Sequence, residues 1–247
     1  MLRLTRGECP QELTDDVKRE LTRLYAENKD RDVWNSPKIK KPLKTALLEM
    51  SHGKCSYCEC LLGIESKDVT IDHFLPKSKH PDQVVEWENL FPACLRCNRE
   101  KKNCQERIVN PCVDEPAQFV ALDKTNTFRF KGIDAEGIGK ATIRTIKLND
   151  IERLIVPRQA EWEDIKQRLE YLYSNLQIAY HKRHRDYLRV LMKKCTSANS
   201  YSAIKATHML HDDTYLKIKS ILMENEAWTE EFENMETEMK KIGLQFS

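Results

Sequence analysis

Apolar residues recur every three or four positions near both ends of the chain, and this spacing predicts helices there. After Thr14, which can cap a helix, Val17 and Leu21 fall on one face. A second helix is expected from Pro42, a favourable first residue, to the stop at Gly53. The first fifty residues are therefore predicted to be helical.

The C-terminal part shows the same periodicity over a longer stretch. A helical region is expected from Asn149, as its N-cap, to about Cys195, with a kink or break at Pro157, because proline disrupts a helix interior. Shorter helices are expected near 203–210 and 215–224. The last helix carries an apolar stripe of Trp228, Phe232, Met235, Met239 and Ile242. This stripe is expected to pack either against a partner protein or against the chain's own core.

Between these helical parts the pattern indicates short strands. DVTIDHF (68–74) and EWENLF (86–91) are typical of strands, and LRCNREKKNCQERI (95–108) is typical of a short helix. QFVALDKTNTFRFKG (118–132) predicts a hairpin with its turn near Asn126. The central order is therefore strand, strand, helix.

These patterns together predict a mostly helical α+β fold. We expect an N-terminal helical segment at 1–53, a core at 54–112, and a hairpin followed by helices at 113–247. A chain of 247 residues with 40% hydrophobic composition can fill one large core or two small ones. No apolar leader or run of eighteen uncharged residues occurs, so a cytoplasmic protein without a membrane segment is expected.

The nine cysteines suggest metal chemistry, because an odd number in a reducing compartment argues against a disulfide framework. Cys55-x-x-Cys58 and Cys94-x-x-Cys97 have the spacing of a tetrahedral zinc site, and four thiolates leave no open position for a substrate. We interpret this zinc as structural. Cys60 could replace Cys58, and four unrelated buried thiols are the alternative. The remaining cysteines are expected to be packing residues.

Polar residues between and after the cysteine pairs indicate more than a passive zinc-binding module. Asp72 and His73 end the first strand, Asn89 precedes the second cysteine pair, and Asn98 follows it. In this order, the stretches IDHFLP, ENLFPACLRCN and NREKKN resemble the HNH endonucleases, the zinc-braced subset of the ββα-metal nucleases. The resemblance covers residues 50–112 and implies a zinc-stapled ββα-metal core.

The resemblance also implies a role for each of these residues. His73 would act as the general base, a task that suits imidazole because its pKa lies near neutral pH. Asp72 and Asn98 would bind catalytic Mg²⁺ or Mn²⁺, and Asn89 would orient the catalytic loop. Successive strand residues face opposite ways, so Asp72 and His73 can share a site only if the strand twists or ends there. Pro76 is compatible with such an ending.

Basic residues near this core are candidates for contacts with phosphate groups. The formal net charge is only +2, so attraction to nucleic acid has to come from a local patch. The candidates are Lys54, Lys77, Lys79, Arg96, Arg99, Lys101 and Lys102. The basic run at 181–185 is interpreted as an exposed helix face, and the alternative is that it extends this basic patch.

Outside the core the chain is similar to the PtuB-type proteins of Septu and retron anti-phage systems. The stretches that carry this similarity include LRLTRGECPQEL, KIKKPLKTALLEMSHGKCSYCE, NPCVDEP and TIRTIKLND. It implies a toxic effector of bacterial defence, held by a PtuA-type ATPase and, in some systems, by a reverse transcriptase with its noncoding DNA. A non-catalytic zinc-knuckle module that binds nucleic acid or serves as a scaffold is the alternative. Whether DNA or RNA is the substrate stays open.

Overall fold

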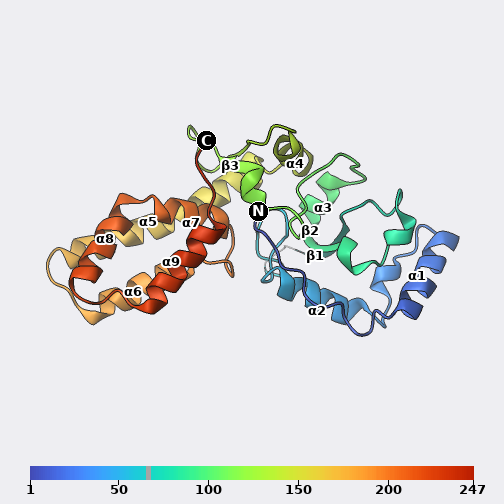
Figure 1. Ribbon diagram of the computed structural model, residues 1–247, viewed down its shortest axis with the longest axis horizontal. Coiled ribbons are helices and arrows are strands. Elements are labelled where there is room, and N and C mark those ends of the chain that lie inside the picture. The colour runs from blue at the N-terminus through green and yellow to red at the C-terminus, as the bar shows by residue number, and fades with distance from the viewer. Residues whose placement is uncertain (65–67) are drawn as a thin grey trace.

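Helices occupy both ends of the chain, and two small antiparallel sheets of two strands each lie between them in the computed structural model (Figure 1). The structure describes residues 1–64 and 68–247. The molecule is elongated, with one lobe around β1, β2 and α3 and a second lobe made of α5 to α9 (Figure 1). The predicted mostly helical α+β fold class is confirmed.

The N-terminal helices follow the predicted apolar pattern closely. Helix α1 spans Asp15–Glu27, and the Thr14 hydroxyl accepts a hydrogen bond from the backbone N–H of Val17 at 3.3 Å. Helix α2 spans Lys40–Met50 and so begins two residues before the expected Pro42. Pro42 still lies in the first turn, where a missing N–H leaves no helical hydrogen bond unmade.

The central element is a strand, strand, helix unit. Strand β1 (Val69–His73) pairs antiparallel with β2 (Leu90–Cys94), and α3 (Leu95–Lys101) follows directly. The expected second strand at 86–91 was placed too early, because Trp87–Asn89 form a 3₁₀ turn. All five residues of β2 are buried, so the strand lacks the alternating pattern that marks a half-exposed strand.

The hairpin predicted at 118–132 is confirmed by β3 (Val120–Leu122) and β4 (Phe130–Gly132). A helix that the apolar pattern did not predict, α4 (Ile138–Ile146), packs beside β4. The Asp134 carboxylate accepts hydrogen bonds from the first backbone N–H groups of α4 at 2.6 and 2.7 Å. A Cβ on Gly139 would lie 1.9 Å from the Phe119 carbonyl oxygen, so glycine permits this close packing.

The helical region expected from Asn149 to Cys195 is divided. Asp150 caps a π-helical turn at Ile151–Ile155, which runs directly into the next helix. Pro157 therefore lies in the first turn of that helix, where it is tolerated. Asn149 is not an N-cap, because its amide exchanges two 2.8 Å hydrogen bonds with the backbone of Phe130 in β4.

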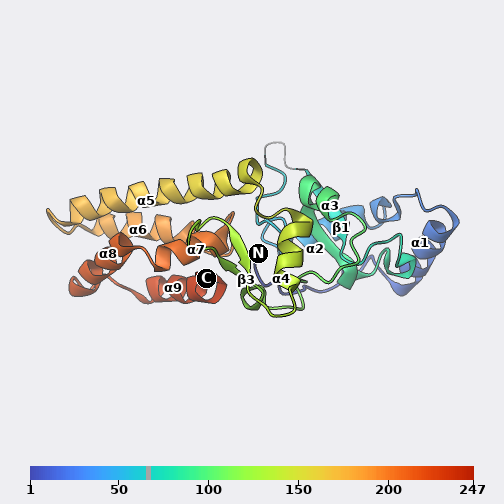
Figure 2. The ribbon, with the colours of Figure 1, turned by 90° about the horizontal axis from the view of Figure 1, so that it is seen from above.

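Five helices form the second lobe, and Figure 2 shows the longest of them, α5, running along one side. Their bounds are Val156–Leu176 (α5), Lys182–Lys193 (α6), Ser202–Leu210 (α7), Asp213–Glu224 (α8) and Glu230–Ile242 (α9). Phe232, Met235 and Met239 of the apolar stripe are buried inside this lobe. The stripe therefore serves the chain's own core rather than a free docking face.

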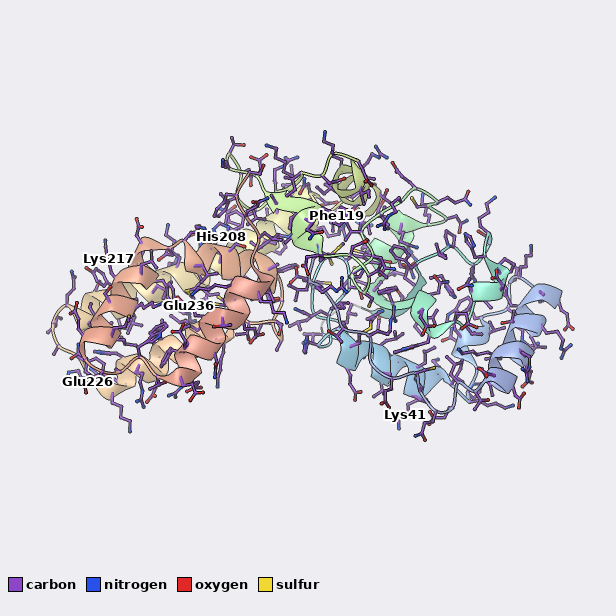
Figure 3. All side chains as sticks on the ribbon, viewed as in Figure 1. Lys41, Phe119, His208, Lys217, Glu226 and Glu236 are labelled. Carbon is purple, nitrogen blue, oxygen red and sulfur yellow. The ribbon has the colours of Figure 1, made fainter. Side chains whose placement is uncertain are left out.

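Two hydrophobic clusters underlie the two lobes. The first runs from Met1 to Leu154 and includes a few residues near 201–204 and Leu244, whereas the second gathers side chains from Trp162 to Met239. His208, labelled in Figure 3, stacks on Phe128 of the hairpin loop at 4.7 Å and so links the lobes. The expected division into three segments remains a prediction. No helix among the described residues is long and apolar enough to cross a membrane.

Candidate functional site

Four cysteines from separate segments meet where the ββα unit begins. Cys55 and Cys58 follow α2, Cys94 ends β2, and Cys97 lies in the first turn of α3. Their sulfur atoms lie within 4.8 Å of one another, and all four side chains are buried. Four sulfur ligands at this spacing could hold one metal ion and suit zinc best. Cys60 is buried beside this cluster but is not one of its four members.

The four thiols of the cluster shift one another's pKa in opposite directions. Hydrogen bonds from neighbouring thiols, first of all from Cys55, lower the pKa of both Cys58 and Cys94. Burial raises the pKa of Cys55, and hydrogen bonds with the other thiols, first of all with Cys55, raise the pKa of Cys97. The Arg153 guanidinium lies 3.3 Å from the Cys97 sulfur and places a positive charge beside it. Sequence reasoning missed Arg153, because it lies 56 positions from Cys97 and no spacing signal connects the two.

His73, at the last position of β1, is held by contacts on two sides. Its ring packs edge-on against Trp34 at 4.8 Å, and its Nε2 lies 2.8 Å from the Val84 carbonyl oxygen. A carbonyl only accepts hydrogen bonds, so this contact assigns the proton to Nε2 and leaves the lone pair on Nδ1. Among the described residues Nδ1 has no hydrogen-bond partner. Burial lowers the pKa of His73 to about 4, so the ring is neutral at pH 7.

Asn89 ties together the loop that follows His73. Its side-chain oxygen accepts a hydrogen bond from the Leu75 N–H at 2.6 Å, and its Nδ2 donates to the carbonyls of Leu75 and Gln83 at 3.1 and 3.0 Å. The side chain is buried, so these bonds are shielded from competing water. This geometry suits the expected loop-orienting role, which stays a prediction.

Asp72 faces away from the His73 ring, as adjacent residues on a regular strand must. Its carboxylate accepts a hydrogen bond from the Tyr57 hydroxyl and forms an ion pair with Lys101 at 3.2 Å. Asn98 lies on the same side, because its Nδ2 donates to the Thr70 hydroxyl at 3.1 Å. The strand does end at His73, which is the condition for the two residues to share a site.

The predicted divalent-cation site is only partly formed. The carboxylate of Asp72 and the amide oxygen of Asn98 are the hard oxygen donors that Mg²⁺ and Mn²⁺ prefer. However, Asp72 is 3% exposed, and its negative charge already has a partner in Lys101. The donor types therefore fit a divalent cation, but the ammonium of Lys101 already pairs with the Asp72 carboxylate.

Two of the basic residues expected to contact phosphate do not fit that role. The Lys54 side chain is buried and donates to the Asn199 carbonyl and the Ser202 hydroxyl, both at 3.0 Å. Lys101 is equally buried in its pair with Asp72. Their place in the motif gave no sign of burial, which depends on the segments that fold over them. Lys77 is half-buried over Trp34, and the exposed candidates are Lys79, Arg96, Arg99 and Lys102.

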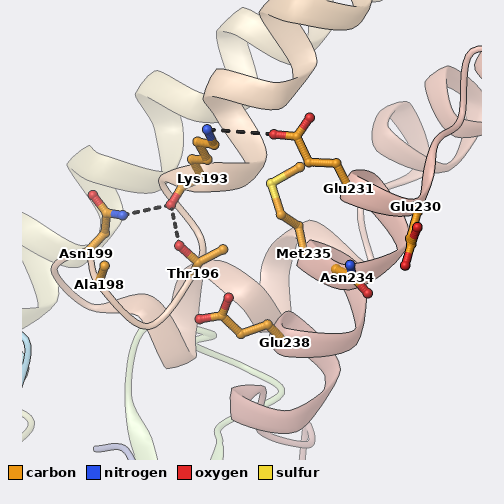
Figure 4. Close-up of a pocket in the computed structure, with 9 residues that line it drawn as sticks. All are labelled: Lys193, Thr196, Ala198, Asn199, Glu230, Glu231, Asn234, Met235 and Glu238. Carbon is orange, nitrogen blue, oxygen red and sulfur yellow. Dashed lines mark hydrogen bonds and ion pairs between the residues drawn. The ribbon is translucent and has the colours of Figure 1, made fainter.

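A hollow of about 770 Å³ opens in the other lobe, between the end of α6 and helix α9 (Figure 4). Its rim is mixed in charge and includes an ion pair of 3.7 Å between Lys193 and Glu231. None of the predicted site residues line it. We therefore do not assign this hollow to the candidate site.

Comparisons with known proteins place this geometry in a family. The HNH endonuclease family model matches residues 55–104, a segment that contains both cysteine pairs and the Asp72 and His73 pair. The Septu protein PtuB of Bacillus thuringiensis is 33% identical over 248 residues, which cover 95% of this chain and 92% of that protein. The Septu protein PtuB of Bacillus mycoides (strain KBAB4) is 25% identical over 159 residues, covering 50% of this chain and 54% of that protein. The chain therefore belongs to the PtuB family of Septu proteins and contains an HNH endonuclease domain.

Proposed function

We propose that this protein is a metal-dependent endonuclease that hydrolyses phosphodiester bonds of nucleic acid, with His73 as its general base. The orientation of the His73 ring carries the proposal. The Val84 carbonyl holds the Nε2 proton, so Nδ1 is free to accept a proton from water. That water attacks phosphorus while the bond to the leaving oxygen breaks.

The other residues support this base without taking the proton. Asn89 fixes the loop beside the ring through hydrogen bonds to Leu75 and Gln83. Asp72 and Asn98 would hold Mg²⁺ or Mn²⁺, which stabilises negative charge on the phosphate when bound. The four cysteines would hold a structural zinc. The exposed Arg96, Arg99 and Lys102 supply local positive charge for the nucleic-acid backbone.

We infer that the biological setting is bacterial defence against phages. Support comes from the relatives, both of which are Septu proteins. By resemblance, the nuclease would be a toxic effector controlled by a PtuA-type ATPase and, in retron systems, also by a reverse transcriptase with its noncoding DNA. This setting makes control by a partner part of the proposal, so activity is tested with and without that ATPase.

Replacing His73 with alanine tests the catalytic role. Cleavage of plasmid DNA and of RNA in the presence of Mg²⁺ should fall by about 100-fold or more, because general base catalysis contributes about 10² to 10⁴. Zinc content and circular dichroism should stay unchanged. His80→Ala is the matched control, since His80 lies in the following loop and its ring has no assigned role.

Full activity of His73→Ala would exclude the mechanism. The alternative function, a zinc-knuckle module that binds nucleic acid without cutting it, predicts binding by both variants and cleavage by neither. Gel-shift and cleavage assays on the same preparations, made with and without the ATPase, distinguish the two functions.

A further inference from the structure

The ammonium group of Lys101 occupies the position of a cation inside the candidate site. Its Nζ lies 3.3 and 3.2 Å from the two carboxylate oxygens of Asp72 and donates to the His73 carbonyl oxygen at 2.6 Å. The side chain of Lys101 is 1% exposed. Carboxylate and carbonyl oxygens around a buried positive charge are also the ligands that a hard divalent cation prefers.

We propose that Lys101 is an internal competitor of the divalent cation, so that the metal binds Asp72 only when the lysine side chain withdraws. This inference rests on the proposed function, because it concerns the cation that the nuclease would use. One buried carboxylate balances one positive charge, and a second cation beside the ammonium would be repelled in this environment of low dielectric constant. With Lys101 in place, its ammonium and the Asp72 carboxylate balance each other's charge.

The position of Lys101 on α3 makes its withdrawal feasible. It is the last residue of the helix, and Lys102 after it leaves the helical conformation with φ 47°. A movement there breaks no hydrogen bonds in the helix interior, and the flexible four-carbon stem of lysine can carry the ammonium outward. Lys101 also lies three residues after Asn98, so the competitor and the second expected ligand share one face of α3.

The Tyr57 hydroxyl keeps Asp72 in place during such an exchange. It donates to the carboxylate from the loop between Cys55 and Cys58, which the four-cysteine cluster braces. The carboxylate therefore stays anchored when Lys101 leaves, and the exchange alters its cationic partner rather than its location. Asp72 would then present its charge to either cation from the same position.

Binding of Mn²⁺ to the zinc-loaded protein, followed by electron paramagnetic resonance, tests the competition directly. Lys101→Met should bind Mn²⁺ about tenfold more tightly than the original protein, because a competing charge beside Asp72 is removed. Lys102→Met, which removes an exposed charge one residue further on, should change the affinity little. Asp72→Asn should abolish Mn²⁺ binding, both by itself and when combined with either lysine variant. Equal Mn²⁺ affinity of Lys101→Met and the unaltered protein would overturn the proposal.

Acetylation of lysine amines, read by mass spectrometry, tests the unaltered protein and decides the question if Lys101→Met does not fold. Saturating Mn²⁺ should raise the labelling of Lys101 several-fold. Lys54, which is as deeply buried but pairs with other residues, should stay protected. If Mn²⁺ binds in an Asp72-dependent way and Lys101 stays protected, the competition is wrong and the proposed nuclease stands. If no Asp72-dependent Mn²⁺ binding occurs in any variant, the metal dependence of the proposed function fails as well.

Discussion

At the scale of single residues, the end of β1 separates two kinds of chemistry on two faces. The His73 ring is positioned by Trp34 and by the Val84 carbonyl, whereas Asp72 is held by Tyr57 and Lys101. Each side chain therefore has its own set of partners although the two are adjacent in sequence. The proposed shared site for one phosphate group depends on the strand ending at this position.

Asn89 provides a residue-scale prediction, because its amide makes three hydrogen bonds in a buried position. Asn89→Ala should lower the free energy of unfolding by about 2 to 3 kcal/mol, since buried loop groups lose their partners. It should also lower nuclease activity at temperatures where the variant remains folded. Urea denaturation measures the first effect and the cleavage assay the second.

Asn225→Ala is the control for Asn89→Ala. Asn225 is exposed and donates one hydrogen bond to the Ile221 carbonyl, so the change should cost less than about 1 kcal/mol. If the two variants were equally stable and equally active, Asn89 would have no special role in the loop.

At the scale of elements, helices α8 and α9 are joined by a buried carboxylate. Glu236 of α9, labelled in Figure 3, accepts hydrogen bonds from Lys219 of α8 at 2.7 and 2.8 Å and from Lys240 at 3.0 Å. The Tyr215 hydroxyl also donates to it at 3.2 Å. Burial by itself would raise the pKa of Glu236, but the hydrogen bonds and charges of the two lysines lower it below the ordinary 4.5.

This lowered pKa predicts how the stability of the helical lobe depends on pH. A carboxyl whose pKa is lower in the folded state stabilises the fold above its ordinary pKa of 4.5, and this contribution is lost as the pH falls through the folded value. Glu236→Gln should therefore be less stable than the original protein at pH 7. The difference should shrink as the pH falls below 4.5 and disappear below the lowered pKa of Glu236, in chemical denaturation measured across the pH range. For Glu224→Gln, at an exposed position, the difference in stability from the original protein should not depend on pH in this way.

At the scale of the whole molecule, the two hydrophobic clusters and the position of the four-cysteine cluster predict that the two lobes depend unequally on zinc. The four cysteines belong to the first cluster, and none of them belongs to the second. Cys94→Ser should lose zinc and lower the melting temperature of the nuclease lobe by about 10 °C or more, because a structural metal contributes folding free energy. Residues 162–239 should keep their helical signal.

Metal analysis and thermal melts followed by circular dichroism measure this effect. Cys9→Ser, a half-buried cysteine outside the cluster, should retain the zinc and the melting temperature. A zinc-free Cys94→Ser protein with an unchanged melting curve would contradict the structural role of the four thiolates.

Much of the fold followed from local patterns. The helical spacing identified α1, α2 and the last three helices, and the alternation and turn residues identified β1 and the second hairpin. Helix α4 was missed because its start depends on Asp134 and on close packing of Gly139 against Phe119, which are tertiary contacts. Strand β2 was misplaced because full burial removed its alternation.

The sequence by itself determined the secondary-structure class, the two cysteine pairs and the order of the HNH motif, because these depend on spacing along the chain. Only the tertiary structure decided which charges are buried and with whom: Lys54 against residues near 199–202, Arg153 against Cys97, and Lys101 against Asp72. The physical reason is that burial and ion pairing depend on distant segments folding side by side. The motif therefore located the candidate chemistry, whereas packing decided which of its residues are free to act.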